Sequence, residues 1–509
     1  MRVLVSVYHK EGLADFCKYM AESQKAEIIA TGGTAKYLAE QKIPCKTVED
    51  YYKVSQLFDG RVKTLSERVF SEILMDRSNP THAKQAAENG AVPLDMVVVN
   101  LYPFMEKCRA GFKNVEDAIE NIDIGGVTLI RAAAKNFKHV AVIVDPRDYK
   151  KVMETMDSGK LAGLRRPLME KAFGYTALYD SVIANHFRQD ILPDYLTFGF
   201  IKHAELRYGE NPHQFAYGYI DPGIKKSIFD ATVFAEKQMS YNNYLDASTA
   251  ISLIIEFQKP ACAIIKHNNP CGGACADTPA KALELAYQTD PISAYGGIIA
   301  LNRKFDMDCA KVVGNKFVDV ILAPGYEADA LETLKLKNGR RLLDVTGLME
   351  EARAMKYHFK KVVGGLLYQT PDNTVADREQ LKFVSEKKPT EQQVTDMLFA
   401  MTFTKHTKSN ALAVARDERV LGIGAGQMSR VDACRLSIEK AKISGLDVKG
   451  AVAASDAFLP FRDTIDTYSE AGVAGLIQPY GSKRDEEVIK AANEKGMILV
   501  FANYRHFRH

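Results

Sequence analysis

The chain's most informative stretch is AIIKHNNPCG, residues Ala263–Gly272. Cys262–Ile265 is a short apolar run that follows Pro260 and precedes a turn rich in proline and glycine, a pattern typical of a buried strand. Lys266 and His267 are therefore predicted at the carboxyl end of that strand, where open α/β sheets place their ligand crevices. A lysine next to a histidine favours the neutral imidazole, the form that accepts a proton near pH 7. The stretch alone also fits a solvated histidine that caps a turn.

Length and composition limit the classes of protein. The 509 residues are enough for at least two domains, each with its own core. The chain lacks an apolar run of about 18 residues, so no membrane span is expected. A net charge of +3 is too slight to indicate nucleic-acid binding. The eight cysteines show no paired framework and Met1 leads into a strand-like run instead of an export signal, so a cytoplasmic location is expected.

Strand-like and helical patterns alternate from the start of the chain, which favours the α/β class. A long, charged helical stretch runs from Asp145 to Asp194, and a mixture of strands and turns restarts after it. A boundary is therefore expected near Leu196, giving domains over residues 1–195 and 196–509. The larger domain has room for two α/β lobes with a polar seam at residues 379–395. The strand-like runs of the first domain are Met1–Val7, Glu27–Ala30, Met96–Asn100 and Val140–Val144.

Two glycine pairs in the first domain are typical of sites that hold an anion. The strand-like run Glu27–Ala30 leads into Thr31-Gly32-Gly33-Thr34, and a helix is expected over Ala35–Gln41. Glycines let backbone N–H groups turn toward a ligand, and a helix start adds partial positive charge. The pattern recurs at Asp123-Ile124-Gly125-Gly126, ahead of an expected helix over Val127–Asn136. Each pattern is also typical of a tight connection between a strand and a helix.

A basic segment, Asp59–Thr64, lies between the two glycine pairs. It alternates like a strand with Arg61 and Lys63 on one face, although a solvated edge strand would show the same pattern. Arg131 and Lys135 add basic groups to the second expected helix. Three segments suited to anions in one α/β domain predict a phosphorylated small molecule as the ligand.

A series of segments recurs in order along one known family: Thr31–Thr34, Gly60–Thr64, Asn100–Phe104, Asp123–Asn136, Leu206–Gln214, Ser240–Asn243, Ile264–Gly272, Asp290–Gly297, Lys408–Asn410, Gly422–Arg430, Ser455–Asp463 and Arg505–His509. The chain resembles the bifunctional purine-biosynthesis enzymes that join 5-aminoimidazole-4-carboxamide ribonucleotide (AICAR) formyltransferase to inosine monophosphate (IMP) cyclohydrolase. The resemblance covers nearly the whole chain. It implies a methylglyoxal-synthase-like doubly wound domain, followed by a larger domain of two cytidine-deaminase-like α/β lobes.

The resemblance implies that a formyl group passes from the cosubstrate 10-formyltetrahydrofolate to the 5-amine of AICAR. That amine is a poor nucleophile because its lone pair is drawn into the carboxamide, so attack needs a base and groups that hold both substrates. His267 matches the family's catalytic base, and Lys266 is placed to tune it and to stabilise charge on the formyl oxygen. The positions that match AICAR contacts are Arg207, Tyr208, Asn242, Gly296, Asp319, Asn410 and Arg430. Those that match folate contacts are Phe458, Pro460, Asp463, Ser482 and Arg505.

The second implied reaction closes formyl-AICAR to IMP. The carboxamide nitrogen attacks the formamide carbon and water leaves, which requires a polarised carbonyl and moved protons but no metal. Lys135 matches the family's proton-handling residue. The positions that match the nucleotide site are Lys10, Thr31, Gly32, Gly33, Thr34, Arg61, Lys63, Thr64, Asn100, Tyr102, Asp123, Gly125 and Gly126.

Two departures from the family pattern lie in the cyclohydrolase domain. Ser66-Glu67 stands where the family usually has His-Pro, and Tyr8-His9-Lys10 stands where it usually has Ser-Asp-Lys. Glu67 would place a negative charge near a phosphorylated substrate, and at an effective dielectric of about 20 two charges about 8 Å apart repel by about 2 kcal/mol. We therefore expect weaker nucleotide binding at this site. A formyltransferase with a weakened or inactive cyclohydrolase domain is the alternative.

Three rival classes share individual motifs with the chain. Asn269–Cys275 invites comparison with zinc deaminases, which use Pro-Cys-x-x-Cys after His-x-Glu. The two cysteines lie one residue too far apart and no His-x-Glu precedes them, so similarity of fold without the metal is favoured. Gly422–Gly426 suggests dinucleotide binding, but its third glycine comes one position early. A non-catalytic nucleotide-binding protein would bind AICAR without folate-dependent turnover.

The family resemblance also implies a homodimer whose transferase site is completed by residues from both partners. The expected partners are thus the small molecules AICAR, formyl-AICAR and formyl-folate, together with a second copy of the chain. Neither nucleic acid nor a membrane is expected as a partner.

Overall fold

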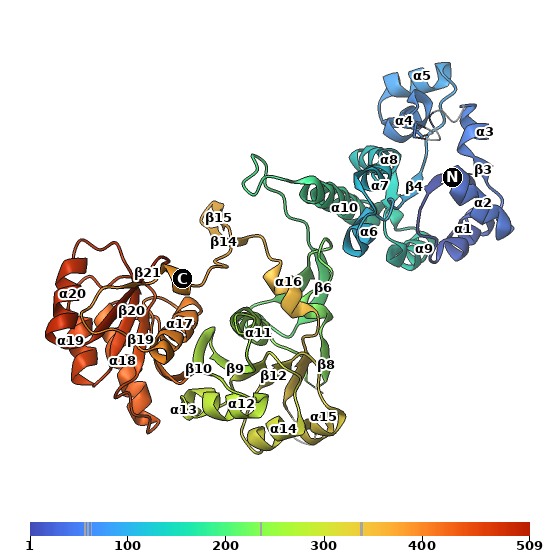
Figure 1. Ribbon diagram of the computed structural model, residues 1–509. Helices are drawn as coiled ribbons and strands as arrows, with labels where there is room; N and C mark the ends of the chain where they lie inside the picture. The colour runs from blue at the N-terminus through green and yellow to red at the C-terminus, as the bar shows by residue number, and fades with distance from the viewer. Residues whose placement is uncertain (55–57, 59–60, 63, 235–236, 336–338) are drawn as a thin grey trace. The chain divides into compact units, whose positions relative to one another are not determined.

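The strand-like runs of the amino-terminal third form a parallel sheet. The computed structural model describes residues 1–54, 58, 61–62, 64–234, 237–335 and 339–509, and these divide into two units. Unit 1 comprises Met1–Ile201 with Asp221–Lys225, and unit 2 comprises Lys202–Ile220 with Lys226–His509 (Figure 1).

The sheet of unit 1 has five described strands, all parallel, in the order β3-β2-β1-β4-β5. They are β1 (Arg2–Ser6), β2 (Glu27–Ala30), β3 (Lys46–Thr47), β4 (Met96–Val99) and β5 (Ala141–Ile143). The helices are α1 (Leu13–Glu22), α2 (Gly32–Glu40), α3 (Val48–Tyr52), α4 (Glu67–Leu74), α5 (Pro80–Glu88), α6 (Phe104–Ala110), α7 (Val115–Glu120), α8 (Gly125–Lys135), α9 (Tyr149–Asp157) and α10 (Leu161–Phe187), with a 3-10 turn η2 (Pro146–Asp148).

Helices cover both faces of this sheet because the strands are apolar on both sides. Side chains alternate along each strand, so Leu4 enters one core and Val5 enters the other. Leu129 of α8 packs in the first core, and Phe16 of α1 packs in the second. The unit is therefore doubly wound, and the predicted α/β class is confirmed.

Unit 2 contains a mixed sheet of twelve described strands, in the order β16-β21-β20-β19-β17-β18-β10-β9-β11-β12-β13-β8. The strands of this sheet are β8 (Thr232–Phe234), β9 (Ala261–Lys266), β10 (Asn269–Cys275), β11 (Ile298–Leu301), β12 (Val320–Ala323), β13 (Arg341–Asp344), β16 (Lys382–Phe383), β17 (Leu412–Arg416), β18 (Arg419–Gly424), β19 (Val452–Ser455), β20 (Gly475–Pro479) and β21 (Ile498–Ala502). Two separate pairs are β6 (Ile201–Leu206) with β7 (Ala216–Ile220) and β14 (His358–Val362) with β15 (Gly365–Gln369).

The helices of unit 2 are α11 (Tyr241–Ile254), α12 (Pro279–Tyr287), α13 (Pro291–Ala294), α14 (Met307–Val313), α15 (Ala328–Lys335), α16 (Leu348–Arg353), α17 (Glu391–Lys405), α18 (Arg430–Ile443), α19 (Asp463–Glu470) and α20 (Asp485–Glu494), with 3-10 turns η3 (Ile228–Asp230) and η4 (Arg378–Gln380). One arrangement occurs twice among them. A helix, α11 or α17, leads into an antiparallel hairpin, β9-β10 or β17-β18, and three further strands follow, β11-β12-β13 or β19-β20-β21. The halves join where β10 pairs with β18.

Both leading helices pack on the same face of the large sheet. Ala250 of α11 and Met401 of α17 belong to one core. The other face carries two separate cores, one around Leu283 of α12 and one around Cys434 of α18. The large sheet is therefore covered on both sides, as buried mixed sheets require.

A glycine in each half lets a helix approach the sheet closely. A Cβ atom at Gly272 of β10 would lie 2.1 Å from the carbonyl oxygen of Ala286 in α12. A Cβ atom at Gly422 of β18 would lie 2.0 Å from the carbonyl oxygen of Ser437 in α18. Any larger residue would push these helices away from the strands that carry the hairpins.

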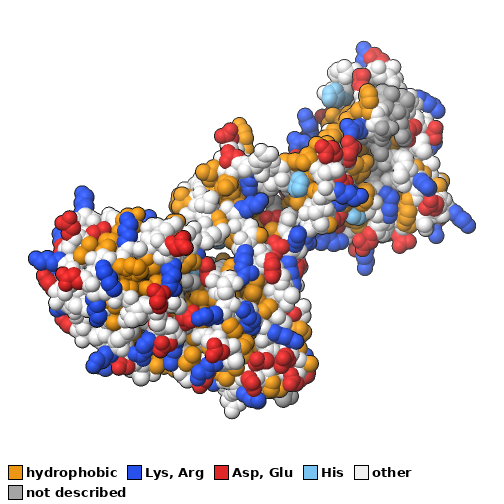
Figure 2. Space-filling view, in the orientation of Figure 1, with side chains coloured by type: hydrophobic (Ala, Val, Ile, Leu, Met, Phe, Trp, Pro, Cys, Tyr) orange, Lys and Arg blue, Asp and Glu red, His pale blue; other side chains and the backbone are white. Residues whose placement is uncertain are grey.

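Charged side chains of both signs are interspersed over the visible faces of both units (Figure 2). This distribution agrees with the formal net charge of +3.

Candidate active sites

A cavity of about 840 Å³ opens in unit 1 where the central strands end. Ser6 is the last residue of β1, and Thr31 and Asn100 directly follow β2 and β4, so all three lie at the edge at which open parallel sheets bind ligands. Most of the residues predicted for the nucleotide site line this cavity. They are Lys10, Thr31, Gly33, Thr34, Arg61, Thr64, Asn100, Tyr102, Asp123, Gly125 and Gly126.

Both predicted glycine pairs form the first turns of helices. Helix α2 begins at Gly32 and α8 at Gly125, so the expected starts at Ala35 and Val127 come too late. The first N–H groups of a helix have no partner within it and lie at the positive end of its dipole. Gly32 itself is next to the lining residues Thr31 and Gly33. Two helix starts thus present amide donors at the cavity.

The turn before α8 leaves no room for larger residues. The Asp123 carboxylate accepts the Gly126 N–H at 2.7 Å and the Tyr102 N–H at 3.3 Å. A Cβ atom at Gly125 would lie 2.7 Å from Thr64 Oγ1, and one at Gly126 would lie 2.7 Å from Asp123 Oδ2. Glycine is therefore required at both positions for Asp123 to cap the helix start while it borders the cavity.

Asn100 holds the unusual loop Tyr8-His9-Lys10. Its side-chain oxygen accepts the N–H groups of Tyr8 at 2.6 Å and His9 at 3.0 Å, and its amide donates to the His9 carbonyl at 3.0 Å. Lys10 Nζ donates to the Tyr8 carbonyl at 3.2 Å and also to that of Val7. The Tyr8 ring meets that of Tyr102 edge-on, with centroids 6.0 Å apart. The altered loop is therefore an ordered wall of the cavity.

Tyr102 retains its phenolic proton at neutral pH. Burial and, to a smaller extent, the Asp123 carboxylate raise the pKa of Tyr102 above its ordinary value. The residue is 39% exposed and lines the cavity. The residue can consequently donate a hydrogen bond or a proton there.

The basic segment is arranged differently from the sequence-based expectation. Arg61 and Val62 lie in a turn, so the predicted strand is wrong for the described residues, and Lys63 lies outside them. The Arg61 guanidinium pairs with Glu120 at the end of α7, and both side chains are largely exposed. Arg61 lines the cavity from this turn.

Lys135 is not near this cavity within one chain. It is the last residue of α8 and is exposed, whereas the cavity lies at the first residue, Gly125. A rise of 1.5 Å per residue separates the two ends by about 15 Å. Arg131 is also exposed, and its guanidinium lies over the Phe173 ring at 5.8 Å.

The departure at Ser66-Glu67 has a local structural role. Ser66 caps α4 by accepting the Val69 N–H at 3.3 Å, and Glu67 is the exposed first residue of that helix. A carboxylate in the first helical turn is favourable to the helix dipole. Glu67 is not among the lining residues described for the cavity. Its charge therefore stabilises the helix start, and the expected weakening of nucleotide binding stays a prediction.

The Lys266–His267 pair of unit 2 lies at the tip of a hairpin. Strand β9 ends at Lys266 and β10 begins at Asn269, so His267 and Asn268 are the turn residues. The turn was expected at Pro270–Gly272, but these residues belong to β10, which carries an irregularity there. Because β9 is antiparallel to both neighbours, the hairpin and not the edge of a parallel sheet determines the position of His267.

The His267 imidazole is exposed, and the Lys266 ammonium is fixed beside it. Lys266 Nζ donates to the carbonyl oxygens of Tyr295 at 3.1 Å and Gly296 at 2.9 Å. A Cβ atom at Gly296 would lie 3.3 Å from Nζ, and the positive φ of 65° also favours glycine. The motif around Gly296 therefore fixes the position of the Lys266 ammonium group.

Asp319 is hydrogen-bonded to the same glycine turn. Its N–H donates to the Gly297 carbonyl at 3.1 Å. Its carboxylate accepts from Asn243 Nδ2 at 2.7 Å and from the Arg341 guanidinium at 2.5 Å. Asn242, the neighbour of Asn243 on α11, donates to the Glu210 carbonyl at 3.3 Å.

The predicted pair Arg207 and Tyr208 follows β6. The guanidinium lies over the Tyr208 ring at 4.6 Å and donates to its hydroxyl at 2.6 Å. The Arg207 side chain is exposed. Among the described residues, the bond from Asn242 to Glu210 links this segment to α11.

A second cavity, of about 350 Å³, lies in the second half of unit 2. Two predicted nucleotide contacts, Asn410 and Arg430, line it together with four predicted folate contacts, Phe458, Pro460, Asp463 and Arg505. Phe461 and Phe507 add aromatic surface. Ser482 lies outside this set, in the loop before α20, where its hydroxyl accepts the Arg484 N–H at 3.1 Å.

Arg430 is buried, and both terminal nitrogens of its guanidinium are hydrogen-bonded. Its guanidinium donates to Ser455 Oγ at 2.9 Å and to Asn410 Oδ1 at 2.8 Å, and it pairs with the buried Asp456. The Asn410 amide donates in turn to the carbonyls of Gln427 and Met428. These contacts fix the polar floor of the second cavity.

One side chain connects the hairpin to this cavity. Asn269 Nδ2 donates to the His267 carbonyl at 3.2 Å, and Asn269 Oδ1 accepts the Lys408 N–H at 2.9 Å. Lys408 is two residues before Asn410. The turn that carries His267 is therefore tied to the segment that carries Asn410 within the same chain.

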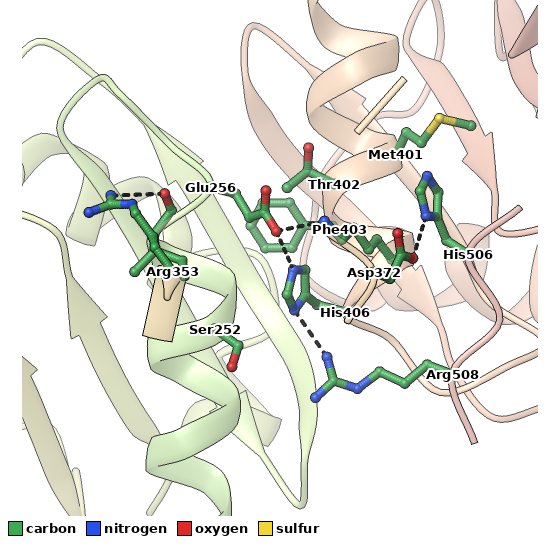
Figure 3. A network of polar contacts seen from close by, with 12 residues as sticks. Ser252, Glu256, Arg353, Asp372, Met401, Thr402, Phe403, His406, His506 and Arg508 are labelled. Carbon is green, nitrogen blue, oxygen red and sulfur yellow. Dashed lines mark hydrogen bonds and ion pairs between the residues drawn. The ribbon is translucent and has the colours of Figure 1, made fainter. Parts of the chain in front are cut away.

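The carboxyl-terminal segment is anchored by a buried polar network (Figure 3). Glu256 accepts from Lys405 Nζ at 2.7 Å and from His406 Nε2 at 3.1 Å, while the Arg508 guanidinium donates to His406 Nδ1 at 3.0 Å. Burial lowers the pKa of His406 to about 4, so the imidazole is neutral at pH 7, as accepting from Arg508 requires. The Arg508 main chain also pairs with Ser409. Arg505 and Phe507 are thereby held at the second cavity.

Neither a metal-binding cluster of histidine, cysteine, aspartate and glutamate nor a helix capable of spanning a bilayer occurs among the residues that the structure describes.

Comparison with known proteins identifies the class to which this fold and these sites belong. Residues 12–128 match the MGS-like domain, and residues 133–440 match the family described as the AICARFT/IMPCHase bienzyme. The chain is 44% identical to the bifunctional purine biosynthesis protein PurH of Magnetococcus marinus, over 100% of this chain and 99% of that protein. It is also 44% identical to PurH of Aquifex aeolicus, over 100% of both chains. The chain therefore belongs to the AICARFT/IMPCHase bienzyme family.

A solved structure described as the crystal structure of ForH is 31% identical, with a TM-score of 0.33. It covers 37% of this chain and 99% of its own.

Proposed function

We propose that a domain over residues 196–509, which includes unit 2, transfers a formyl group from 10-formyltetrahydrofolate to AICAR, and that a domain over residues 1–195, which makes up most of unit 1, closes formyl-AICAR to IMP. Membership of the bienzyme family supports both activities. The observation that carries the assignment to sites is that residues predicted from scattered segments gather at two cavities, eleven of them at the cavity of unit 1.

In formyl transfer, the nitrogen of the AICAR 5-amine attacks the formyl carbon while the His267 imidazole removes a proton from it. The new N–C bond forms as the bond from carbon to N10 of the folate breaks, and the proton passes to the departing N10. The exposed imidazole supports this role because it is open to a ligand. Lys266, held by the Tyr295 and Gly296 carbonyls, is placed to stabilise the negative charge that develops on the formyl oxygen.

Substrate binding follows from the surroundings of these groups. The exposed Arg207 guanidinium suits the 5′-phosphate of AICAR, because its planar fork matches phosphate oxygens. Asn410 and Arg430 border the nucleotide side of the second cavity, and Phe458 and Asp463 supply the apolar wall and the carboxylate that a pterin ring requires. Tyr208, Asn242, Gly296 and Asp319 complete the proposed nucleotide set, and Pro460, Ser482 and Arg505 the folate set.

In ring closure, the substrate phosphate binds the helix starts of unit 1. The carboxamide nitrogen then attacks the formamide carbon, and the bond from that carbon to its oxygen breaks. The departing water takes up the two protons that the carboxamide and formamide nitrogens lose, and the neutral Tyr102 hydroxyl relays one of them by donating its own proton and taking one back. Asp123 is next to Tyr102 and is fixed by the Gly126 N–H. Lys135 acts at this site only if a second copy of the chain supplies it, because Lys135 is too distant from the cavity of the same chain.

We also propose that the chain is a homodimer. The β14–β15 pair supports this, because Val363 is 106% exposed, Leu367 is 62% exposed and Phe359 is 44% exposed. An isolated two-stranded pair with apolar side chains in water is not stable on its own, and a partner chain would cover it. A cytoplasmic location and the absence of a metal requirement stay predictions from the sequence.

The test follows formyl-AICAR and IMP separately in a mixture of AICAR and 10-formyltetrahydrofolate. His267→Ala is expected to abolish formyl transfer by removing the base, while cyclisation of supplied formyl-AICAR continues at the wild-type rate. Lys135→Ala should slow cyclisation and leave transfer measurable. Loss of both activities in folded His267→Ala would contradict the division of labour. A wild-type chain that accumulates formyl-AICAR without IMP would show the cyclohydrolase assignment to be wrong.

A further inference from the structure

The turn that carries His267 is held by a carboxylate from the preceding helix. Asp246 of α11 accepts the Asn268 N–H at 2.7 Å and the His267 N–H at 3.2 Å. One oxygen serves each donor. This arrangement fixes two successive peptide groups at the tip of the hairpin.

The main chain at this tip needs such support. His267 and Asn268 have φ values of 51° and 61°, in the left-handed region that hairpin turns of two residues require. Glycine is the usual solution, and other residues pay a conformational cost there. The Asp246 carboxylate offsets that cost because it satisfies both N–H groups of the turn.

The second half of unit 2 contains the same device without the reactive side chains. Asp396 accepts the N–H groups of Asp417 at 3.0 Å and Glu418 at 2.8 Å, and those residues have φ values of 53° and 51°. Asp246 and Asp396 are each the sixth residue of their helices, α11 and α17. Both helices also begin with a capping box. Each aspartate therefore accepts the two N–H groups of a left-handed turn, one in each half of unit 2.

We propose that Asp246 is a positioning residue for formyl transfer, acting through the main chain of His267 to aim the imidazole at the substrate amine. The inference rests on the proposed transferase function of the hairpin. Asp246 itself need not touch either substrate, because its two oxygens are directed at the turn. Asn269 supports the same geometry from the other side by donating to the His267 carbonyl.

The chain provides a matched control for the experiment. Asp246→Asn replaces one acceptor of the turn at His267 with a donor, and Asp396→Asn does the same at Asp417-Glu418. Both full-length variants should lose a similar amount of thermal stability. Only Asp246→Asn should lower kcat for formyl transfer, by at least about tenfold with a KM for AICAR near that of wild type, because a small misplacement of a base is costly. Asp396→Asn should stay within about twofold of the wild-type kcat.

Two further measurements separate positioning from other effects. Asp246→Asn should bind AICAR in a direct binding assay as tightly as the wild-type chain does, since Asp246 acts only through the His267 imidazole; a large loss of binding would overturn the proposal in favour of a substrate contact. The pH profile of kcat for Asp246→Asn should keep the shape of the wild-type profile at a lower level. A profile that is merely displaced along the pH axis would overturn the proposal in favour of a charge effect on the imidazole. Equal losses of kcat in the two single variants would overturn it in favour of general destabilisation.

Failure of the inference is distinguishable from failure of the proposed function. If the wild-type chain does not form formyl-AICAR, the transferase assignment is wrong, and the Asp246 proposal falls with it. If the wild-type chain is active and Asp246→Asn matches it, only the positioning role is wrong. Should Asp246→Asn not fold, Asp246→Glu keeps the charge and displaces the carboxylate by one methylene. It should still lower kcat at an unchanged KM, and wild-type kcat in Asp246→Glu would contradict the proposal.

Discussion

At the scale of single residues, the ion pair between Arg61 and Glu120 lies at the cavity of unit 1. Both side chains are largely exposed, and both line the cavity. A substrate phosphate that binds Arg61 has to displace Glu120. An exposed pair of this kind contributes about 0.2–1 kcal/mol, which corresponds to an effect on binding of about fivefold at most.

Glu120→Gln is therefore expected to lower the KM for cyclisation of formyl-AICAR by about two- to fivefold, with kcat unchanged. Steady-state kinetics at low and high salt would check this, because the difference should shrink as salt screens the pair. Glu116→Gln is the matched control, since Glu116 is exposed on the same helix and is not a lining residue. A rise in KM for Glu120→Gln would show that Glu120 helps to bind the substrate.

Residue patterns could predict most of this cavity but not how its parts are used. The Gly125-Gly126 pair is recognisable because close approach of neighbouring side chains requires glycine there, and Thr31 and Asn100 are recognisable as polar residues directly after strands. Glu120 and Tyr8 carry no such signal, since they reach the cavity through tertiary contacts alone. The helix-start role of Glu67 could not be recognised from the sequence, because a carboxylate at a helix start and one at a ligand site look the same there.

At the scale of elements, the end of α17 should make stability depend on pH. The pKa of the buried His406 is lowered to about 4 from an ordinary value of 6.5. Glu256 and Arg508 are the charged groups bonded to it, and Lys405 is bonded to Glu256. Between these two pH values the unfolded chain binds a proton that the folded chain does not, so stability falls as the pH drops from 6.5 towards 4.

His406→Gln should remove this contribution, which amounts to roughly 3 kcal/mol at its largest. The urea midpoint of the wild-type chain should therefore fall more between pH 7 and pH 5 than the midpoint of the variant. His203→Gln, at an exposed position of unit 2, is the control and should keep the wild-type dependence. A wild-type midpoint independent of pH over this range would contradict the neutral, buried state of His406.

The hairpin β9–β10 shows where pattern reasoning about elements fails. The buried strand before Lys266 was predicted correctly from its apolar run. The turn was not, because His267 and Asn268 lack the glycine that marks such a turn, whereas Pro270–Gly272 carries the usual signal. The carboxylate that permits the turn lies on α11, so only the tertiary structure reveals it.

At the scale of the whole molecule, a dimer with a shared transferase site makes a quantitative prediction. The variants His267→Ala and Asp463→Asn alter the hairpin turn and the second cavity separately. If each site combines the turn of one protomer with the cavity of the other, a mixed dimer has one intact site and one doubly altered site. An equal mixture that exchanges subunits should regain about a quarter of the wild-type transferase activity.

Mixing His267→Ala with Lys266→Ala is the matched control, because both changes fall on the same turn. That mixture should regain nothing. Light scattering of tagged chains would show whether subunits exchange. If they exchange and the first mixture regains no transferase activity, each complete site lies within one chain. A monomer of full transferase activity at micromolar concentration would contradict the dimer itself.

The paired turns of unit 2 show that a hairpin can be held independently of the side chains that it presents. In each half the hold on the turn depends on main-chain N–H groups and not on which side chains the turn carries. One hairpin carries Lys266 and His267, and the other carries Arg416 and Asp417 at the same places. The second hairpin is therefore a place where other side chains, including a lysine and a histidine, can be introduced by protein engineering without loss of the turn.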